Sequence, residues 1–160
     1  MTEFSPLLRL LTEAKIDFIL AGGLAAGAHG SARLTRDIDI VYRRDRANLE
    51  RLVAALAPLH PYLRGAPPGL PFRWDVETVA AGLNFTLVTD LGWLDLLGEI
   101  TGGGRYEDLE QDSAVIDLFS VQCRVLNLEN LIATKRAAGR PKDFEAIAEL
   151  ELILERRKER

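Results

Sequence analysis

One stretch decides the fold of this chain: Arg36-Asp37-Ile38-Asp39-Ile40-Val41. Its aspartates alternate with apolar residues, which is the pattern of a β-strand buried on one face. In a strand, residues i and i+2 point to the same side roughly 6.6 Å apart, so the carboxylates of Asp37 and Asp39 should project together. Two anions held this close repel each other, and a divalent cation relieves the repulsion. Because all the ligand atoms are oxygens, we expect a hard ion such as Mg²⁺.

A glycine pair, Gly22-Gly23, lies upstream of these aspartates with thirteen residues between them. An apolar run over residues 17–21 precedes the pair and an Ala-rich run over residues 24–29 follows it, so we expect a strand to pass into a short helix here. Backbone N–H groups at such a junction can bind phosphate oxygens, although a tight turn would also explain two glycines. Taken with the aspartates, the pair indicates a metal-dependent enzyme that acts on a nucleoside triphosphate.

Length and composition are those of one small domain, which we expect to span residues 1–160, with 48% hydrophobic residues to form a core. The single cysteine and two histidines make an internal disulfide impossible and a zinc cluster unexpected. A net charge of −4 argues against a surface that coats nucleic acid. No apolar run approaches the ~20 residues that span a bilayer, and the N-terminus is not basic. We therefore expect a cytoplasmic protein without a membrane partner.

The remaining pattern predicts an α/β (α+β) fold, with a small mixed sheet of five or six strands flanked by helices. Strands are expected at residues 17–21, 38–42, 84–89, 93–98, 114–119 and 121–126. Helices are expected at residues 6–14, 24–29 and 48–59, and a C-terminal helical part should start at about residue 127.

Two further segments carry specific expectations. The Pro- and Gly-rich residues 58–71 should form a loop, long enough to act as a lid or to contact the substrate. The last helix should open at Pro141 and bury one apolar face, formed by Phe144, Ile147, Leu150 and Leu154.

Either of two later aspartates could join the pair as a third carboxylate. Asp95 lies in the expected strand at residues 93–98, and Asp117 lies in the one at residues 114–119. Each alternates with apolar neighbours and therefore faces away from them. The alternation alone leaves both candidates open.

This arrangement resembles the nucleotidyltransferase superfamily, whose best-known member is DNA polymerase beta. The resemblance rests on Gly22-Gly23, on Asp37-Ile38-Asp39 and on Asp95, which matches the family's third acid better than Asp117 does. Small bacterial nucleotidyltransferases related to abortive-infection toxins are similar over most of the chain. The motifs shared with them are His29-Gly30, Arg33-Leu34-Thr35-Arg36-Asp37-Ile38-Asp39 and Lys135-Arg136-Ala137-Ala138-Gly139-Arg140-Pro141-Lys142-Asp143. The chain departs from the pattern at Leu24, where many members have a serine.

The resemblance implies transfer of a nucleoside monophosphate from a nucleoside triphosphate, with ATP as a candidate, to a hydroxyl group. Asp37, Asp39 and Asp95 would be the catalytic residues and would hold two Mg²⁺ ions, or Mn²⁺. The triphosphate would be bound by Lys135 as its main anchor and by Gly22, Gly23, Arg36, Arg140 and Lys142.

The acceptor stays open between RNA such as tRNA, a protein side chain and a small molecule such as an antibiotic, and a cognate antitoxin would make the protein half of a toxin–antitoxin pair. A catalytically inactive module that senses nucleotides or binds a partner is the alternative function. Haloacid-dehalogenase phosphatases also use paired aspartates, but theirs follow an apolar strand, whereas Asp37 and Asp39 open one.

Overall fold

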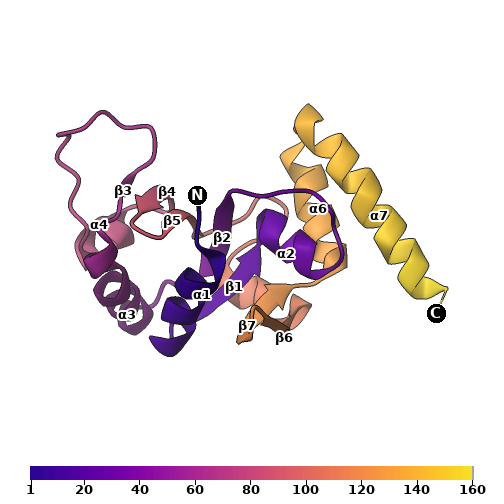
Figure 1. The fold of residues 1–160 in the computed structure, drawn as a ribbon, viewed down its shortest axis with the longest axis horizontal. Coiled ribbons are helices and arrows are strands. Elements are labelled where there is room, and N and C mark those ends of the chain that lie inside the picture. The colour runs from indigo at the N-terminus through magenta and orange to yellow at the C-terminus, as the bar shows by residue number, and fades with distance from the viewer. Residues whose placement is uncertain (160) are drawn as a thin grey trace.

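The computed structural model describes residues 1–159, which form a mixed sheet with helices around it (Figure 1). The seven strands are ordered β3-β4-β5-β2-β1-β7-β6. This confirms the predicted fold class. The strands are β1 (Phe18–Ala21), β2 (Asp37–Tyr42), β3 (Tyr62–Leu63), β4 (Asn84–Thr89), β5 (Gly92–Leu97), β6 (Ser113–Leu118) and β7 (Val121–Leu126). The α-helices are α1 (Phe4–Glu13), α2 (Gly22–Ala28), α3 (Arg46–Leu56), α4 (Val76–Ala81), α5 (Tyr106–Leu109), α6 (Leu128–Ala138) and α7 (Phe144–Lys158).

The expected count of five or six strands was wrong, because residues 58–71 are not all loop. Within them, Tyr62 and Leu63 form β3, which pairs antiparallel with β4 and forms one edge of the sheet. Two residues are too few to show a period-2 pattern, so the alternation rule could not find this strand. Ala57–Leu59 form a 3₁₀ turn before β3, and residues 64–71 belong to the connection between β3 and α4, which stands away from the sheet in Figure 1.

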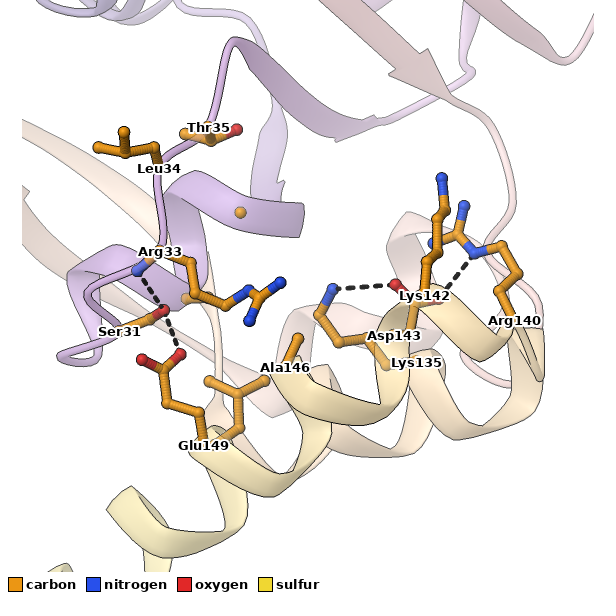
Figure 2. Close-up of a pocket in the computed structure, with 13 residues that line it drawn as sticks. Ser31, Arg33, Leu34, Thr35, Lys135, Arg140, Lys142, Asp143, Ala146 and Glu149 are labelled. Carbon is orange, nitrogen blue, oxygen red and sulfur yellow. Dashed lines mark hydrogen bonds and ion pairs between the residues drawn. The ribbon is translucent and has the colours of Figure 1, made fainter.

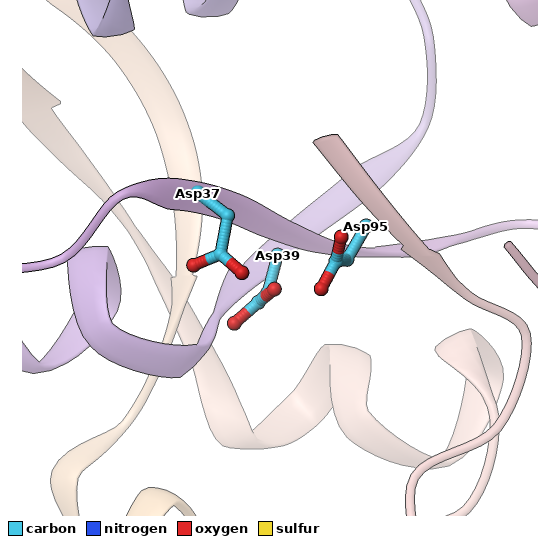
Figure 3. Close-up of side chains that lie close together, drawn as sticks. All are labelled: Asp37, Asp39 and Asp95. Atoms are coloured by element: carbon cyan, nitrogen blue, oxygen red, sulfur yellow. The ribbon is translucent and has the colours of Figure 1, made fainter. Parts of the chain in front are cut away.

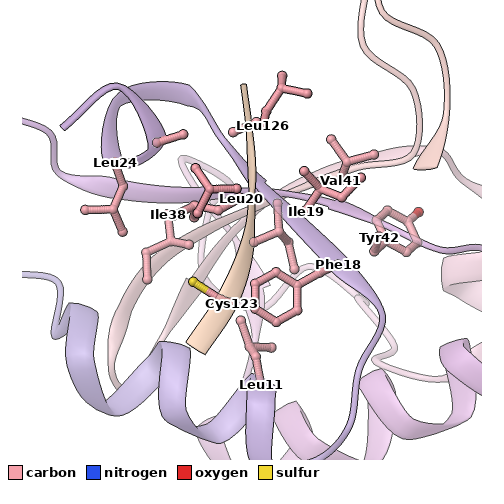
Figure 4. Close-up of a cluster of buried hydrophobic side chains, with 14 of the residues drawn as sticks. Leu11, Phe18, Ile19, Leu20, Leu24, Ile38, Val41, Tyr42, Cys123 and Leu126 are labelled. Carbon is pink, nitrogen blue, oxygen red and sulfur yellow. The ribbon is translucent and has the colours of Figure 1, made fainter. Parts of the chain in front are cut away.

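The centre of the sheet is β2, which runs antiparallel to β1 and parallel to β5. Ile38 and Ile40 of β2 are fully buried. They join a core contributed by several elements, among them Leu11 of α1, Phe18 and Leu20 of β1 and Cys123 of β7 (Figure 4). Because side chains alternate along a strand, burying the isoleucines turns the aspartates of β2 to the other face.

The last helix differs from the prediction at its first turn. Pro141–Asp143 form a 3₁₀ turn, and α7 begins only at Phe144. Ala146, Ile147 and Leu150 are the buried residues of α7, whereas the Phe144 residue is 63% exposed, so its assignment to the buried face was wrong. The buried face of α7 is therefore narrower than the spacing of its apolar residues suggested. Among residues 1–159, no helix has both the length and the apolar character that a membrane crossing requires.

Candidate metal and nucleotide site

Three aspartates converge at the middle of the sheet (Figure 3). Asp37 and Asp39 come from β2, and Asp95 comes from β5, where the parallel register places it opposite Asp39. Each carboxylate has an oxygen within 4.8 Å of an oxygen of the other two. Asp117 lies on β6, the edge strand at the far side of the sheet, where it pairs with Gln122 and is exposed. The structure therefore brings Asp95, and not Asp117, to the predicted pair.

The surroundings of the three aspartates penalise negative charge. Burial, followed by the negative charges of Asp37 and Asp95, raises the pKa of Asp39 to about 8. Burial also raises the pKa of Asp95, although a hydrogen bond and the positive charge from Arg64 oppose this effect. A cation bound among the carboxylates would relieve the penalty. The all-oxygen donor set and its charge thus fit a hard divalent ion.

Gly22 lies where the backbone comes closest to Asp39. It has a φ of +63°, and a Cβ atom at this position would lie 1.8 Å from Asp39 Oδ2. At Gly23 a Cβ would lie 2.9 Å from the side chain of Thr35. The pair does more than form a tight turn, because any side chain at Gly22 would enter the space that Asp39 occupies.

Arg64 is a member of the site that sequence reasoning missed. Its Nη2 donates to Asp95 Oδ1 at 2.7 Å, and its Nη1 lies 3.8 Å from Asp37 Oδ2. The guanidinium also covers the ring of Trp93, 4.5 Å from the ring centre. Arg64 directly follows β3 in the segment that was expected to be a loop. No local pattern marks it; the only available signal was the need of three clustered acids for a positive partner.

Cationic residues from α6 and the turn after it line a second part of the site (Figure 2). Asp143 is buried between two of them, 3.9 Å from Lys135 Nζ and 2.7 Å from Arg140 Nε. A cavity of about 250 Å³ is lined by Gly23, Lys135, Arg140 and Lys142, and also by Arg33, which the sequence analysis did not select. Predicted phosphate-binding residues far apart in the chain are thereby brought together.

A neighbouring cavity connects these cations to the acidic cluster. It has a volume of about 390 Å³, and Gly22, Asp39, Lys135 and Arg140 all line it. Arg36 lines neither cavity. It lines a third cavity, of about 630 Å³, together with four apolar residues, Met1, Phe4, Leu34 and Trp93, and with Thr2 and Thr35. Arg36 thus lines a different cavity from the one that Gly23, Lys135, Arg140 and Lys142 share.

Comparison with known proteins identifies the class of fold. No protein-family model matches the sequence, and no curated protein sequence matches it. Among solved structures, the chain is similar to the lincosamide antibiotic adenylyltransferase LnuA in its lincomycin-bound form, with 18% identity, a TM-score of 0.62 and coverage of 96% of this chain and 98% of that chain. It is also similar to a Thermotoga maritima protein described as a nucleotidyltransferase, with 16% identity, a TM-score of 0.50 and coverage of 100% and 97%. The chain thus shares its fold with these two proteins, which is the fold that the resemblance predicted.

Proposed function

We propose that this protein is a metal-dependent nucleotidyltransferase that moves a nucleoside monophosphate from a nucleoside triphosphate to a hydroxyl acceptor. The observation that carries the proposal is the cavity that Asp39 shares with Gly22, Lys135 and Arg140. It places a candidate metal ligand beside cations that can bind phosphate, on the fold of the nucleotidyltransferase superfamily.

Asp37, Asp39 and Asp95 would hold Mg²⁺, for which Mn²⁺ can substitute. When bound, the metal would offset the negative charge that builds up on the phosphoryl oxygens during transfer. Lys135, Arg140 and Lys142 would bind the β- and γ-phosphates, helped by backbone N–H groups at Gly22 and Gly23. Because Asp143 holds both Lys135 and Arg140, it would keep these cations oriented toward the cavity.

The chemical step follows from the roles of these residues. The acceptor oxygen forms a bond to the α-phosphorus. The bond from that phosphorus to the oxygen that bridges the α- and β-phosphates breaks, and pyrophosphate leaves. Asp95 takes the proton of the acceptor hydroxyl. Cations at Lys135 and Arg140 stabilise the charge on the departing pyrophosphate.

We further propose a small hydroxylated molecule with an apolar surface as the acceptor. The cavity of about 630 Å³ supports this choice, because Phe4, Leu34 and Trp93 line it, and Trp93 pairs with Asp37 across the sheet. The similarity in fold to LnuA, an antibiotic adenylyltransferase, supports it as well. The net charge of −4 makes RNA a less favourable acceptor. ATP as the donor and a cognate antitoxin stay predictions from the resemblance.

Thermal unfolding with each of the four nucleoside triphosphates tests the proposal. A ligand at a hundred times its dissociation constant adds about 2.7 kcal/mol of stability, a shift of several degrees in midpoint for a chain of this size. We expect one or more nucleotides to stabilise the wild type only with Mg²⁺, and the Asp37→Ala/Asp39→Ala variant not at all. Asp117→Ala, which removes an exposed aspartate on β6, is the matched control and should respond like the wild type.

The acceptor is then sought with the stabilising nucleotide labelled at its α-phosphate. Small hydroxylated compounds, total RNA and a purified protein mixture are incubated separately with enzyme and Mg²⁺. Label on a small compound supports the acceptor proposed here, and label on RNA or protein overturns it. If no nucleotide shifts the wild type, the inactive partner-binding module becomes the better description.

A further inference from the structure

The guanidinium of Arg64 already lies among the three carboxylates, where a cation is expected. We propose that Arg64 takes the place of one of the two expected metal ions, the one that Asp95 would help to bind on the side of the acceptor, so that the site binds one divalent ion, at Asp37 and Asp39. This inference rests on the proposed function, and it departs from the two ions that the resemblance implies.

Arg64 is held by contacts that do not depend on the acids. Its Nη2 donates to the backbone carbonyl of Leu87 at 2.9 Å, and the Trp93 ring packs against its guanidinium. The side chain is only 21% exposed, and its Nε atom is buried without a hydrogen-bond partner. A side chain fixed by a carbonyl and an aromatic ring stays in place when an ion binds nearby, because moving it would lose these contacts.

Arg64 also contacts one carboxylate oxygen of Asp95, the residue that a second ion would need as a ligand. Its Nη2 lies 2.7 Å from Asp95 Oδ1, which is a full hydrogen bond, whereas its distance to the Asp37 carboxylate is 3.8 Å. A divalent ion at Asp95 would have to sit beside this permanently charged guanidinium and would be repelled by it. Asp37 and Asp39, both on β2, have carboxylate oxygens within 4.8 Å of each other, close enough to share one ion.

The charges agree with a single ion. Three ionised carboxylates carry three negative charges, and Arg64, which is effectively always protonated, offsets one of them. One divalent ion offsets the other two. Arg64 is therefore a positioning residue: it orients Asp95 and supplies the positive charge that a second ion would otherwise provide.

Electron paramagnetic resonance of bound Mn²⁺ tests this count without relying on activity. Two ions in a shared site would lie ~3.5–4 Å apart and would be magnetically coupled, whereas one bound ion gives an uncoupled spectrum. The protein is saturated with Mn²⁺ and with the α,β-methylene form of the nucleotide that stabilises it most. We expect one uncoupled ion per chain in the wild type and in Arg64→Lys, and a coupled pair in Arg64→Ala, because that variant frees Asp95.

Arg46→Ala is the matched control, since it removes an exposed arginine of α3 that pairs with Glu50 and Glu77. It should keep one uncoupled ion. A coupled pair in the wild type would overturn the role of Arg64 and leave the proposed function standing. An Arg64→Ala variant that is folded and still binds a single ion would also overturn it. Failure of the wild type to bind any Mn²⁺ would overturn the metal site itself; if Arg64→Ala does not fold, the wild-type count still decides.

Discussion

At Gly22 the backbone and the Asp39 carboxylate occupy adjoining space, and a single methyl group would not fit between them. In Gly22→Ala the new Cβ would clash with the Cβ, Cγ and Oδ2 atoms of Asp39, at a residue whose φ of +63° already disfavours a side chain. We expect a loss of about 2–4 kcal/mol in the free energy of unfolding. Mn²⁺ affinity should also fall at least about tenfold, because Asp39 is displaced.

Gly27→Ala is the control for this change, since it lies in the same helix, α2, and a Cβ there would meet nothing within 4 Å. It should leave metal binding unchanged and raise stability by roughly 0.5–1 kcal/mol, because alanine is the better helix former. Urea unfolding and Mn²⁺ titration of both variants provide the measurements. Equal behaviour of the two variants would contradict the close approach at Gly22.

The raised pKa of Asp39 predicts an unusual pH dependence for the metal-free protein. Its pKa is about 8 in the folded chain and 3.8 as an ordinary aspartate, so between these values the folded state binds more protons than the unfolded state. Stability therefore falls as the pH rises toward 8. In EDTA, we expect the unfolding midpoint of the wild type to drop more between pH 5 and pH 8 than that of Asp39→Asn, which carries no charge there.

Mg²⁺ should reverse this fall in the wild type, because it stabilises the ionised carboxylate, and should have little effect on Asp39→Asn. Differential scanning calorimetry at several pH values, with EDTA or with Mg²⁺, measures both effects. If the unfolding midpoint of the wild type changes with pH in the same way as that of Asp39→Asn, the surroundings of Asp39 do not raise its pKa.

Among the secondary-structure elements, α3 is tied to the central strands by one buried side chain. Asn48 is fully buried; its Nδ2 donates to the carbonyls of Asp17 at 3.1 Å and Arg43 at 2.7 Å, and its Oδ1 accepts from the Asp17 N–H at 2.7 Å. These partners directly precede β1 and follow β2. Asn48→Ala would remove this partner from the Asp17 N–H and from the Arg43 carbonyl, whereas the Asp17 carbonyl would still accept from the Arg43 N–H. We expect a loss of about 2–4 kcal/mol in chemical denaturation.

Glu50→Ala, on the exposed side of α3, is the comparison for Asn48→Ala. Its change in stability should stay within about 0.5 kcal/mol. A loss below 1 kcal/mol for Asn48→Ala would mean that water replaces the missing partner and that the side chain does not hold α3 in place.

The site as a whole draws on five parts of the chain: the glycine pair, the paired aspartates of β2, Arg64, Asp95, and the cations at residues 135–142. If these parts have separate tasks, changing one cation should affect the nucleotide but not the metal. Lys135→Met should weaken nucleotide binding in the presence of Mg²⁺ at least about tenfold, or about 1.4 kcal/mol, since a charge-assisted contact to phosphate is lost. Mn²⁺ binding without nucleotide should be unchanged.

Lys158→Met, at the end of α7, removes an exposed lysine and should leave both ligands bound as in the wild type. Isothermal titration of nucleotide and of Mn²⁺ separates the two effects. A loss of Mn²⁺ binding in Lys135→Met would show that α6 supports the acidic cluster directly, and not only the triphosphate.

Much of the fold could be predicted from local patterns in the sequence. Alternation along residues 36–41 was sufficient to predict a strand with two carboxylates on one of its faces. Successive side chains of a strand point to opposite faces, so every second residue shares a face. The glycine pair, the paired aspartates and Asp95, together with the longer shared motifs, were sufficient to predict the fold, which the structural comparisons confirm. Most helices and the six longer strands follow from apolar periodicity and lie near their predicted residues.

Tertiary structure decided the features that depend on pairing between distant segments. Asp95 and Asp117 have the same local pattern, and only the parallel register of β2 with β5 placed Asp95 opposite Asp39. Arg64 reaches the acids because β3, too short for any periodic signal, joins the edge of the sheet. In each case the deciding contacts join residues far apart in sequence, and such contacts leave no mark on the local pattern.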